Sequence, residues 1–563
     1  MFEIFFSLVL SIFFVFSAGV ISSKYLLRLN LDDLELYEFG FIGIFFLVFL
    51  SFIIHFFFAL NIQTNSYLFG IILLILLINI HKFSSFIKSI NITLIFVSLL
   101  VVFIMTLKYR PNEDYGYYHL PYIINLVSEK IVFGLSNIQL NFAWNSTWLN
   151  FSSLFYLPLL KLKGTQLSNS ILYFFVIYLF LKESLRKENF LKLSHSFIFI
   201  VSCYVLIKFS RISEHGFDFP ANFFLIFAFY YFLKIFEDNS DTQIKKNFIL
   251  LILFSIFCIT IKLSTFASPI LVISAFILLL NKKIKLDFLI LPIIFFSFFI
   301  LFWFLQQFAY SGCISPFFKF TCFESVVWYS DGVSNAVGDA TGLVNKSFNQ
   351  YKGSLSPEEY LSNFNWVSTW FGRNKIEFSE HLAPLIIPFI LILIFNFKSN
   401  FKNNEENLQI QLKLNKLFYF TITLFIVIGI SIWFLKSPVI RFGIPYLFLL
   451  VFFSISLILK IFNFKYLKIK DGIKFVLIIA LFFNISKNIM RIKNSDTNSY
   501  WPNILTFNYS YNLVNKLKIY YPDSGQSYHK TKYCWSIPFI CHMNGGKNLK
   551  FQKIVNYIIV SVD

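Results

Sequence analysis

The chain has 563 residues, of which 57% are hydrophobic and only 14% are charged, and its mean hydropathy is +0.69. Soluble domains carry about 25% charged residues, so the composition excludes a soluble globular protein and indicates a polytopic membrane protein. The formal net charge is +19, but the basic residues are spread over short connections and form no polybasic run. Such a distribution is typical of a membrane orientation signal, and nucleic acid is not an expected partner.

About fourteen apolar stretches are long enough to cross a bilayer with some tilt or local thinning. The first has no basic segment before it and no small-residue cleavage site, so we expect it to be retained as an anchor. The stretches lie at 3–20, 39–60, 67–80, 92–107, 168–182, 195–210, 220–236, 247–262, 265–280, 287–305, 381–397, 415–435, 443–460 and 473–487.

The lysines and arginines between these stretches predict the orientation, because basic residues resist translocation. If the N-terminus lies outside and 148–160 does not cross, most basic connections fall on the cytoplasmic side. One conflict remains, since Lys487, Arg491 and Lys493 follow the last stretch on the outside. The basic residues that agree are Lys24, Arg28, Lys82, Lys88, Arg186, Lys187, Lys245, Lys246, Lys282, Lys283 and those from Lys398 to Lys416.

This orientation divides the chain into six parts and predicts an all-α polytopic membrane fold with a small external α/β tail. Three parts are helical, and three are external. The parts are N-terminal transmembrane helices (1–107), an external loop with interfacial helices (108–167), a transmembrane core (168–305), a second external loop (306–380), C-terminal transmembrane helices (381–487) and an external tail (488–563).

Four of the six cysteines lie in external parts, as two close pairs. Cys313 and Cys322 are nine residues apart, and Cys534 and Cys541 are seven apart. External thiols pair in an oxidising compartment, and neither spacing matches the Cys-x2-Cys pattern of zinc sites. Two disulfides are therefore favoured over a zinc site.

A set of charged residues falls at the outer end of the bundle, and it begins directly behind the apolar stretch 92–107. Charged groups beside a bilayer are costly and commonly functional. Acids from two loops and cations from two others suit a reaction on a phosphate-linked substrate, in which a carboxylate accepts a proton and a cation neutralises the phosphate. The set comprises Glu113, Asp114, His119, Arg211, Glu214, His215, Asp218, Lys262 and Arg441.

Several of these residues also have a purely structural explanation. Asp114 and Asp218 each precede a predicted helix, where aspartate is a common N-cap, and His119 could be an interfacial histidine satisfied by a backbone carbonyl. Arg441 could be an interface anchor. The residues Trp144, Trp148, Trp366 and Trp370 are most simply read as an aromatic belt.

The sequence Glu113-Asp114-Tyr115 with Tyr118-His119, followed by expected interfacial segments at 117–128 and 147–160, resembles the GT-C superfamily of membrane glycosyltransferases. That resemblance implies a GT-C-like fold, with Asp114 as the base that deprotonates an acceptor hydroxyl while a polyprenyl phosphate departs. Glu113 and His119 would support it. Three additional spans before the acidic loop depart from the superfamily core, and Glu214 with Asp218 match its second acidic motif only loosely.

Four motifs are similar to those of an uncharacterised group of bacterial multi-span proteins. These are the acidic stretch ending Tyr118-His-Leu-Pro121, Gly134-Leu-Ser-Asn137, Phe142-Ala-Trp-Asn-Ser-Thr-Trp148 and, in the tail, Cys534-Trp-Ser-Ile-Pro-Phe-Ile-Cys541. The resemblance reaches both ends of the chain and implies a fold more than an activity.

The expected function is transfer of a sugar from a polyprenyl-phosphate donor to a glycan, lipid or protein acceptor at the cell surface. Lys262, Arg441 and Arg211 would bind the donor phosphate, while Asp218 and Glu214 would form a second acidic site. No cofactor is certain, but Asp114 and Asp218 would be the ligands of a divalent cation if one is used. The expected location is the bacterial inner membrane, with the active side and the C-terminus periplasmic.

Two other functions fit parts of the sequence. An O-antigen polymerase or ligase would have a similar span count, but it would rely on arginines and a histidine in the large external loop, where only Arg373 lies, with His381 at its edge. A flippase or transporter would place charges near the middle of the membrane. The charges here lie mostly at outer ends.

Overall fold

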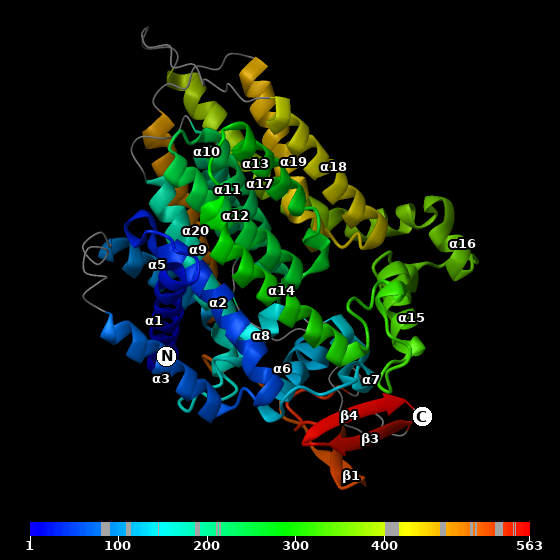
Figure 1. Ribbon diagram of the computed structural model, residues 1–563. Coiled ribbons are helices and arrows are strands. Elements are labelled where there is room, and N and C mark those ends of the chain that lie inside the picture. Colours follow the sequence, from blue (N-terminus) through cyan, green and yellow to red (C-terminus); the bar gives the residue numbers. More distant parts are fainter. Residues whose placement is uncertain are drawn as a thin grey trace.

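The computed structural model describes the chain except for residues 80–90, 109–113, 145, 186–191, 210–211, 213–214, 400–415, 462–468, 496–498, 502–503, 524–532, 544, 547 and 563. Helices dominate, and each predicted apolar stretch overlaps one of them (Figure 1). The helices of the bundle are α1 (Phe2–Tyr25), α2 (Leu36–Phe57), α3 (Ile62–Ile78), α5 (Ile92–Thr106), α9 (Ser168–Ser184), α10 (Leu193–Lys208), α11 (Asp218–Glu237), α12 (Asp241–Ile261), α13 (Pro269–Asn281), α14 (Ile290–Ser311), α17 (Trp366–Ser399), α18 (Lys416–Lys436), α19 (Ile440–Ile461) and α20 (Ile469–Lys493).

Among the residues described, nine helices are long and apolar enough to cross a membrane. Four more apolar helices are shorter, at Ile62–Ile78, Ile92–Thr106, Leu193–Lys208 and Ile440–Ser454. These lengths and compositions indicate an integral membrane protein. The total of about fourteen spans stays a prediction.

Close packing of helices begins at the N-terminal pair. A Cβ atom on Gly19 of α1 would lie 1.8 Å from the carbonyl oxygen of Phe39, and one on Gly43 of α2 would lie 2.0 Å from that of Val15. Small residues allow such backbone approach between membrane helices. Phenylalanine rings then fill the spaces between α2 and its neighbours, as where Phe41 stacks on Phe227 with ring centroids 4.6 Å apart.

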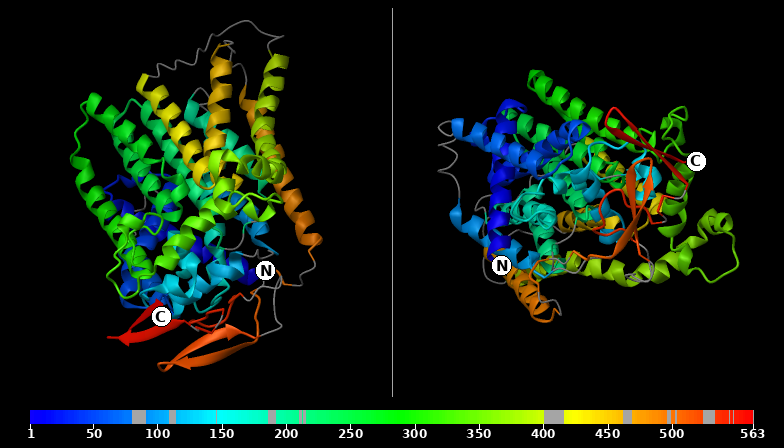
Figure 2. Two further views of the ribbon diagram at one scale, coloured as in Figure 1. Left: turned by 90° about the vertical axis from the view of Figure 1, so that its right-hand side faces the viewer. Right: turned by 90° about the horizontal axis from the view of Figure 1, so that it is seen from below.

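Short helices form a layer across one end of the bundle, at the end where both chain termini lie (Figures 1 and 2). They are α6 (Leu120–Ser128), α7 (Leu135–Ile138) and α8 (Thr147–Ser153). All seven residues of α8 are buried, and α8 packs against α2 and α6. The expected interfacial helix at 147–160 is therefore shorter than predicted and enclosed by protein.

The aromatic-belt interpretation is wrong for the three tryptophans whose side chains the structure describes. Trp148, Trp366 and Trp370 have exposed fractions of 0%, 1% and 6%, and the last two pack edge to face in one cluster. Belt residues would face lipid headgroups. These indoles instead fill protein interior.

The predicted second loop, 306–380, is partly helical. Its first residues belong to α14, and α17 begins at Trp366, well before the predicted start of that span. Between them lie two short helices, α15 (Asp331–Asp339) and α16 (Pro357–Leu361). Figure 1 shows them beside the outer end of the bundle.

The tail consists of two antiparallel hairpins rather than the expected α/β unit, since no helix follows α20 in its described residues. Strands β1 (Tyr509–Val514) and β2 (Leu517–Pro522) pair with Tyr509 opposite Pro522. Strands β3 (Leu549–Ile554) and β4 (Tyr557–Val562) pair with Leu549 opposite Val562. The hairpins lie under the layer of short helices (Figure 2).

Candidate functional site

Asp114 stands directly before the π-helical turn η3 (Tyr115–His119), which leads into α6. Its backbone is already helical, and its side chain makes no capping hydrogen bond to that turn. The side chain is 41% exposed. Capping therefore does not explain this carboxylate, which is accessible at the end of the bundle that carries the layer of short helices.

Asp218, the first residue of α11, pairs with two cations from other elements. Its Oδ1 pairs with Nζ of Lys262, which follows the end of α12. Its Oδ2 lies 2.6 Å from Nε of Arg441, near the start of α19. Arg441 also places Nη2 3.8 Å from Oδ2 of Asp114. These four residues form what we call the outer cluster, with Arg441 between its two carboxylates.

The two cations of the outer cluster differ in accessibility. Lys262 is enclosed: its side chain is 18% exposed, and its Nζ lies 3.1 Å from the ring centroid of Phe442. Arg441 is 43% exposed. Its backbone is held in place by Asn222 of α11, whose Nδ2 donates to the Arg441 carbonyl at 2.8 Å. A ligand at this surface therefore meets Arg441 before Lys262.

His119 lies behind the outer cluster and is 4% exposed. Neither ring nitrogen has a hydrogen-bond partner among the described residues, so the expected backbone carbonyl is not found. The pKa of His119 is lowered to about 3, mainly by burial; Asp218 opposes this shift, and Lys262 and Arg441 add to it. The imidazole is therefore neutral at physiological pH.

The outer cluster combines a proton acceptor with an anion-binding group at one accessible position. Its two carboxylates and two cations balance in formal charge. Arg441 uses Nε for Asp218 and keeps further N–H donors for a ligand, because a guanidinium carries five. A carboxylate beside a guanidinium can take a proton from a hydroxyl while the guanidinium binds a departing oxyanion.

Three residues of the predicted site, Glu113, Arg211 and Glu214, lie outside the described residues, so the structure does not place them. Within the described part, no group of three or more potential ligand side chains is arranged to hold a metal ion. Asp114 and Asp218, the two predicted ligands, have Arg441 between them.

A layer of aromatic and polar groups supports the turn that follows Asp114. His215 is fully buried, and its ring stacks on Tyr115 with centroids 5.3 Å apart. Its Nε2 lies 2.9 Å from Oγ1 of Thr165, while Gln166 donates to the Tyr115 hydroxyl at 2.6 Å. His215 therefore supports the acidic motif from beneath, whereas the sequence had placed it only among the outer charges.

Arg491 accounts for one of the basic residues that conflicted with the predicted orientation. Its Nη1 donates to the carbonyls of Leu107 and Lys108 at 2.7 and 2.8 Å, and Nη2 donates to those of Ile104 and Met105 at 3.3 Å. The last carbonyls of a helix have no partner within it. Arg491 thus caps the C-terminal end of α5, the helix that precedes the acidic segment.

The Gly134-Leu-Ser-Asn137 motif joins the outer loop to the tail. Gly134 has φ +73°, and a Cβ atom there would lie 2.0 Å from the carbonyl oxygen of Val560 in β4. The Asn137 amide donates to the carbonyls of Val560 and Trp328 at 2.9 and 3.0 Å. Phe133 exchanges two backbone hydrogen bonds with β4. The motif is a structural joint that sequence reasoning had not assigned.

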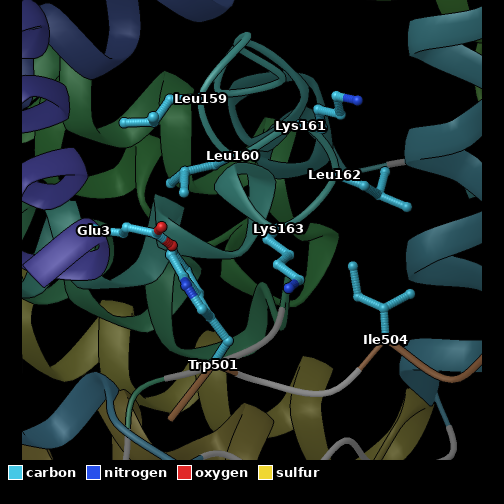
Figure 3. Close-up of a pocket in the computed structure, with 8 residues that line it drawn as sticks. All are labelled: Glu3, Leu159, Leu160, Lys161, Leu162, Lys163, Trp501 and Ile504. Carbon is cyan, nitrogen blue, oxygen red and sulfur yellow. The ribbon is translucent and has the colours of Figure 1, made fainter. Parts of the chain in front are cut away.

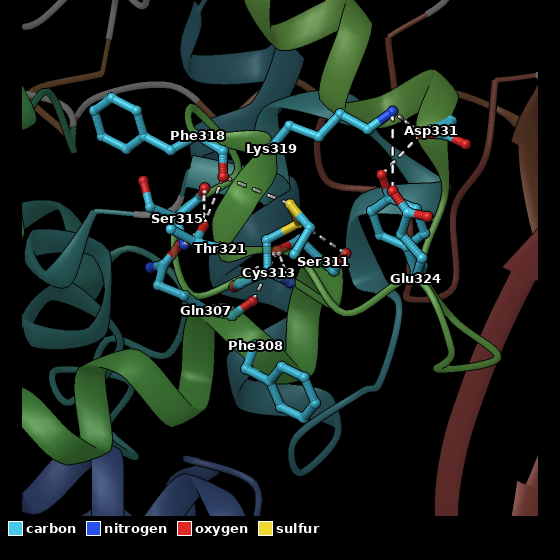
Figure 4. The surroundings of a disulfide bond; sticks show 12 residues. Gln307, Phe308, Ser311, Cys313, Ser315, Phe318, Lys319, Thr321, Glu324 and Asp331 are labelled. Carbon is cyan, nitrogen blue, oxygen red and sulfur yellow. Dashed lines mark hydrogen bonds and ion pairs between the residues drawn. A yellow bond between two sulfur atoms is a disulfide. The ribbon is translucent and has the colours of Figure 1, made fainter.

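Both predicted disulfides are confirmed. Cys313 pairs with Cys322 and Cys534 pairs with Cys541, while Cys203 and Cys258 are free and buried. Figure 4 shows the first disulfide beside the end of α14, with Lys319 3.1 Å from Asp331 at the same loop. The second disulfide closes a loop of the tail that lies against Gly116.

Two cavities lie near the outer end. One, of about 340 Å³, is lined by Glu3, Leu159, Leu160, Lys161, Leu162, Lys163, Trp501 and Ile504 (Figure 3). In Figure 3 the Lys161 side chain points away from Trp501. The other, of about 210 Å³, has an aromatic lining from α17 and α18 and includes Ile440, the neighbour of Arg441.

A second charged group lies inside the bundle, toward its other end. Glu38 lies 3.3 Å from Nζ of Lys246 and accepts a hydrogen bond from the Tyr231 hydroxyl at 2.5 Å. Glu183 lies 3.0 Å from the ring of His195. Lys246 and Lys262 are about 24 Å apart along α12. These buried charges are paired and separate from the outer cluster.

The fold and the outer cluster define a helical integral membrane protein with paired acids and cations at one end of its bundle. The chain belongs to a family described as a domain of unknown function (DUF8201), whose model matches residues 1–448. The matched part holds the whole outer cluster and the joint at Gly134, and it ends before the tail. No curated protein and no solved structure matches the chain.

Proposed function

We propose that the protein is a membrane glycosyltransferase of GT-C type, which moves a sugar from a polyprenyl-phosphate donor to a glycan, lipid or protein acceptor at the cell surface. The observation that carries the proposal is Arg441, which lies between the accessible Asp114 and the paired Asp218. An acid and a guanidinium side by side suit a reaction that takes up a proton and releases a phosphate.

In the proposed reaction Asp114 accepts the proton of the acceptor hydroxyl. The hydroxyl oxygen forms a bond to the anomeric carbon of the donor sugar as the bond from that carbon to the phosphate oxygen breaks. Polyprenyl phosphate leaves with the bonding electrons, and N–H groups of Arg441 that do not face Asp218 bind the developing negative charge.

Asp218 and Lys262 have a positioning role in this scheme. Asp218 fixes the Nε side of Arg441, so that the guanidinium stays directed toward Asp114. Lys262 offsets the charge of Asp218 and is too enclosed to be the first contact of a phosphate. In this scheme Arg441, rather than Lys262, is therefore the main phosphate-binding residue.

Two observations favour this function over its rivals. His381, the histidine that an O-antigen polymerase or ligase would use, is 8% exposed and bonded to the Tyr204 hydroxyl at 2.7 Å. A flippase or transporter would have charged residues near the middle of the membrane. The second charged group, which includes Glu38 and Glu183, lies instead toward the helix ends opposite the outer cluster.

The test replaces Asp114 by Asn in a bacterial host that carries the gene, with Asp331→Asn as control. Asp331 is an exposed aspartate that pairs with Lys319 on the second loop. Surface glycans would be compared on gels, and lipid-linked sugars would be extracted and separated. We expect Asp114→Asn to lose a glycan modification and to accumulate a sugar on polyprenyl monophosphate.

Three other results would refute the proposal. Unchanged glycan at normal protein level would remove Asp114 from any essential role. Accumulation of a repeat unit on polyprenyl diphosphate would indicate the polymerase or ligase instead. Accumulation of a lipid-linked sugar confined to the cytoplasmic leaflet would indicate a flippase.

A further inference from the structure

The tail places one tryptophan directly on the turn that follows Asp114. Trp535 is 1% exposed, and its backbone N–H donates to the carbonyl of Gly116 at 3.0 Å. Its ring meets Tyr115 edge to face with centroids 5.9 Å apart. The tail therefore contacts the acidic motif two residues from Asp114, although the two segments are far apart in the sequence.

Gly116 is the residue that admits this contact. A Cβ atom there would lie 2.1 Å from two atoms of the Trp535 ring, a separation that real Cβ atoms do not show. Any other residue at position 116 would push the indole away. The glycine in Tyr115-Gly-Tyr117 is therefore explained by close packing of the tail, since its own φ is not in the left-handed region.

A second aromatic pair lies beside the first. Tyr533 packs on Tyr117 with ring centroids 4.7 Å apart. The side chains of Tyr533 and Trp535 thus contact residues on both sides of Gly116. Contacts on both sides restrict how the turn can rotate, and therefore the direction in which the Asp114 side chain leaves it.

The loop that carries Trp535 is itself held at several points. The disulfide between Cys534 and Cys541 closes it. The backbone N–H of Tyr520 in β2 donates to the Ile540 carbonyl at 2.8 Å, and the Tyr520 carbonyl accepts from the His542 N–H at 2.9 Å. The Ser536 hydroxyl donates to the Leu505 carbonyl at 2.7 Å. The indole is therefore presented by a loop fixed to the first hairpin.

We propose that Trp535 is a positioning residue for Asp114: the disulfide loop of the tail holds the turn at Gly116 so that the Asp114 carboxylate faces Arg441. Trp535 touches neither substrate nor the reacting atoms in this scheme. It acts through Gly116 and Tyr115. The part of this inference that concerns catalysis rests on the proposed glycosyl transfer, while the part that concerns the turn stands on its own.

The experiment measures the hydrogen-exchange protection of the turn and the amount of glycan product separately. The full-length protein would be purified in lipid nanodiscs as wild type, Trp535→Ala, Trp535→Phe and Gly116→Ala. The matched control is Trp328→Ala, because Trp328 is also at a joint between the outer loop and the tail, where it packs on Phe133. Amide hydrogen exchange would be followed in peptides covering 114–120, α9, α11 and both hairpins, and surface glycan would be scored in cells.

We expect Trp535→Ala and Gly116→Ala to speed exchange in 114–120 by about tenfold or more, with exchange in α9 and α11 unchanged. Glycan product should fall strongly in both variants. Trp535→Phe should restore much of the protection and of the product, because a smaller aromatic ring can still cover Gly116. Trp328→Ala should leave 114–120 protected.

Unchanged exchange in 114–120 of Trp535→Ala and Gly116→Ala would overturn the inference. It would also be overturned if exchange rises while the glycan is retained, in a strain where Asp114→Asn abolishes the glycan. If Asp114→Asn itself leaves the glycan intact, the proposed function fails. The exchange result then still decides whether the tail holds the turn.

Discussion

The Nε atom of Arg441 lies 2.6 Å from Oδ2 of Asp218, while Nη2 of the same guanidinium lies 3.8 Å from Oδ2 of Asp114. Two carboxylates from well-separated parts of the chain thus lie beside the guanidinium of Arg441, which comes from a third part. A guanidinium presents donors in several fixed directions, whereas an ammonium is a single point charge. Arg441 can therefore serve two carboxylates at once.

Replacing Arg441 by Lys should abolish most of the proposed activity although the charge is kept. The shorter ammonium can pair with one carboxylate but cannot also bind a departing phosphate in a defined direction. We expect at least about a hundredfold loss of glycan product, which corresponds to about 2.7 kcal/mol of transition-state stabilisation. Quantitative glycan gels would check this, with Arg373→Lys on α17 as control. Full product from Arg441→Lys would contradict the role of the guanidinium.

Asp218→Asn should destabilise the protein, because it leaves Lys262 facing Arg441 without the shared carboxylate. Breaking a largely enclosed ion pair by removing one partner costs several kcal/mol when the pair is fully buried, and partial exposure here reduces that to about 2 kcal/mol. Thermal unfolding in detergent would show a lower midpoint.

A double variant, Asp218→Asn with Lys262→Met, tests whether the unpaired Lys262 causes the loss of stability in Asp218→Asn. Met removes the cation that Asp218 had neutralised and keeps an apolar side chain against Phe442. We expect the double variant to unfold at a higher temperature than Asp218→Asn alone. A double variant that is less stable by the sum of two independent losses would show that Lys262 and Asp218 do not interact.

The buried His119 should make the folded protein less stable as the pH falls from neutral. Its pKa is about 3 in the folded state, against about 6.5 when unfolded. Between these values the unfolded chain binds a proton that the folded one does not, so stability falls with decreasing pH by about 1.4 kcal/mol per unit. At pH 5 the loss from this residue is about 2 kcal/mol.

A His119→Gln variant isolates this contribution from those of other histidines. Its unfolding midpoint should fall less steeply between pH 7 and pH 5 than that of the wild type, whatever its stability at pH 7. Detergent-solubilised protein and a fluorescence melt suffice. Parallel slopes in the two proteins would mean that the pKa of His119 is the same in the folded and unfolded states.

The two disulfides should differ in their effect on function. Replacing Cys534 and Cys541 together by Ser should reduce glycan product, because the loop that carries Trp535 loses its closure. Replacing Cys313 and Cys322 together should have a smaller effect, since that disulfide lies just after the end of α14 and does not close the loop that carries Trp535. Equal losses from both pairs, at equal protein level, would remove the special importance of the tail loop.

Much of the outer cluster could be anticipated from the sequence, because charges that interrupt an apolar chain are few and orientation rules place them on one side. Asp114, Asp218, Lys262 and Arg441 are predicted in this way, whereas the two cysteine pairs are predicted from their close spacing and expected external position. The pattern could not indicate which charges pair with one another. Asp218 was expected to be a supporting acid or a metal ligand, and in the structure it pairs with Lys262 and Arg441.

Other features could not be predicted, either because the contacting residues are far apart in the sequence or because the sequence does not show whether a side chain faces lipid or protein. The role of Gly116 has no local signal in the sequence, since its partner Trp535 is remote and no local pattern encodes that contact. Trp148, Trp366 and Trp370 were assigned to a belt, because an aromatic residue near a predicted span reads the same whether it faces lipid or protein. Arg491 contradicted the orientation rule until its role at the end of α5 was visible.

The contact of Trp535 with Gly116 also bears on the order of synthesis. All the apolar helices precede the tail in the chain, so they leave the ribosome and can insert before residue 535 has been made. The indole can reach the turn beside Asp114 only after residue 535 has been made, when the described apolar helices have all been synthesised. A chain that stops before residue 535 would therefore carry the residues of the outer cluster but lack the contact that we propose holds the turn beside Asp114.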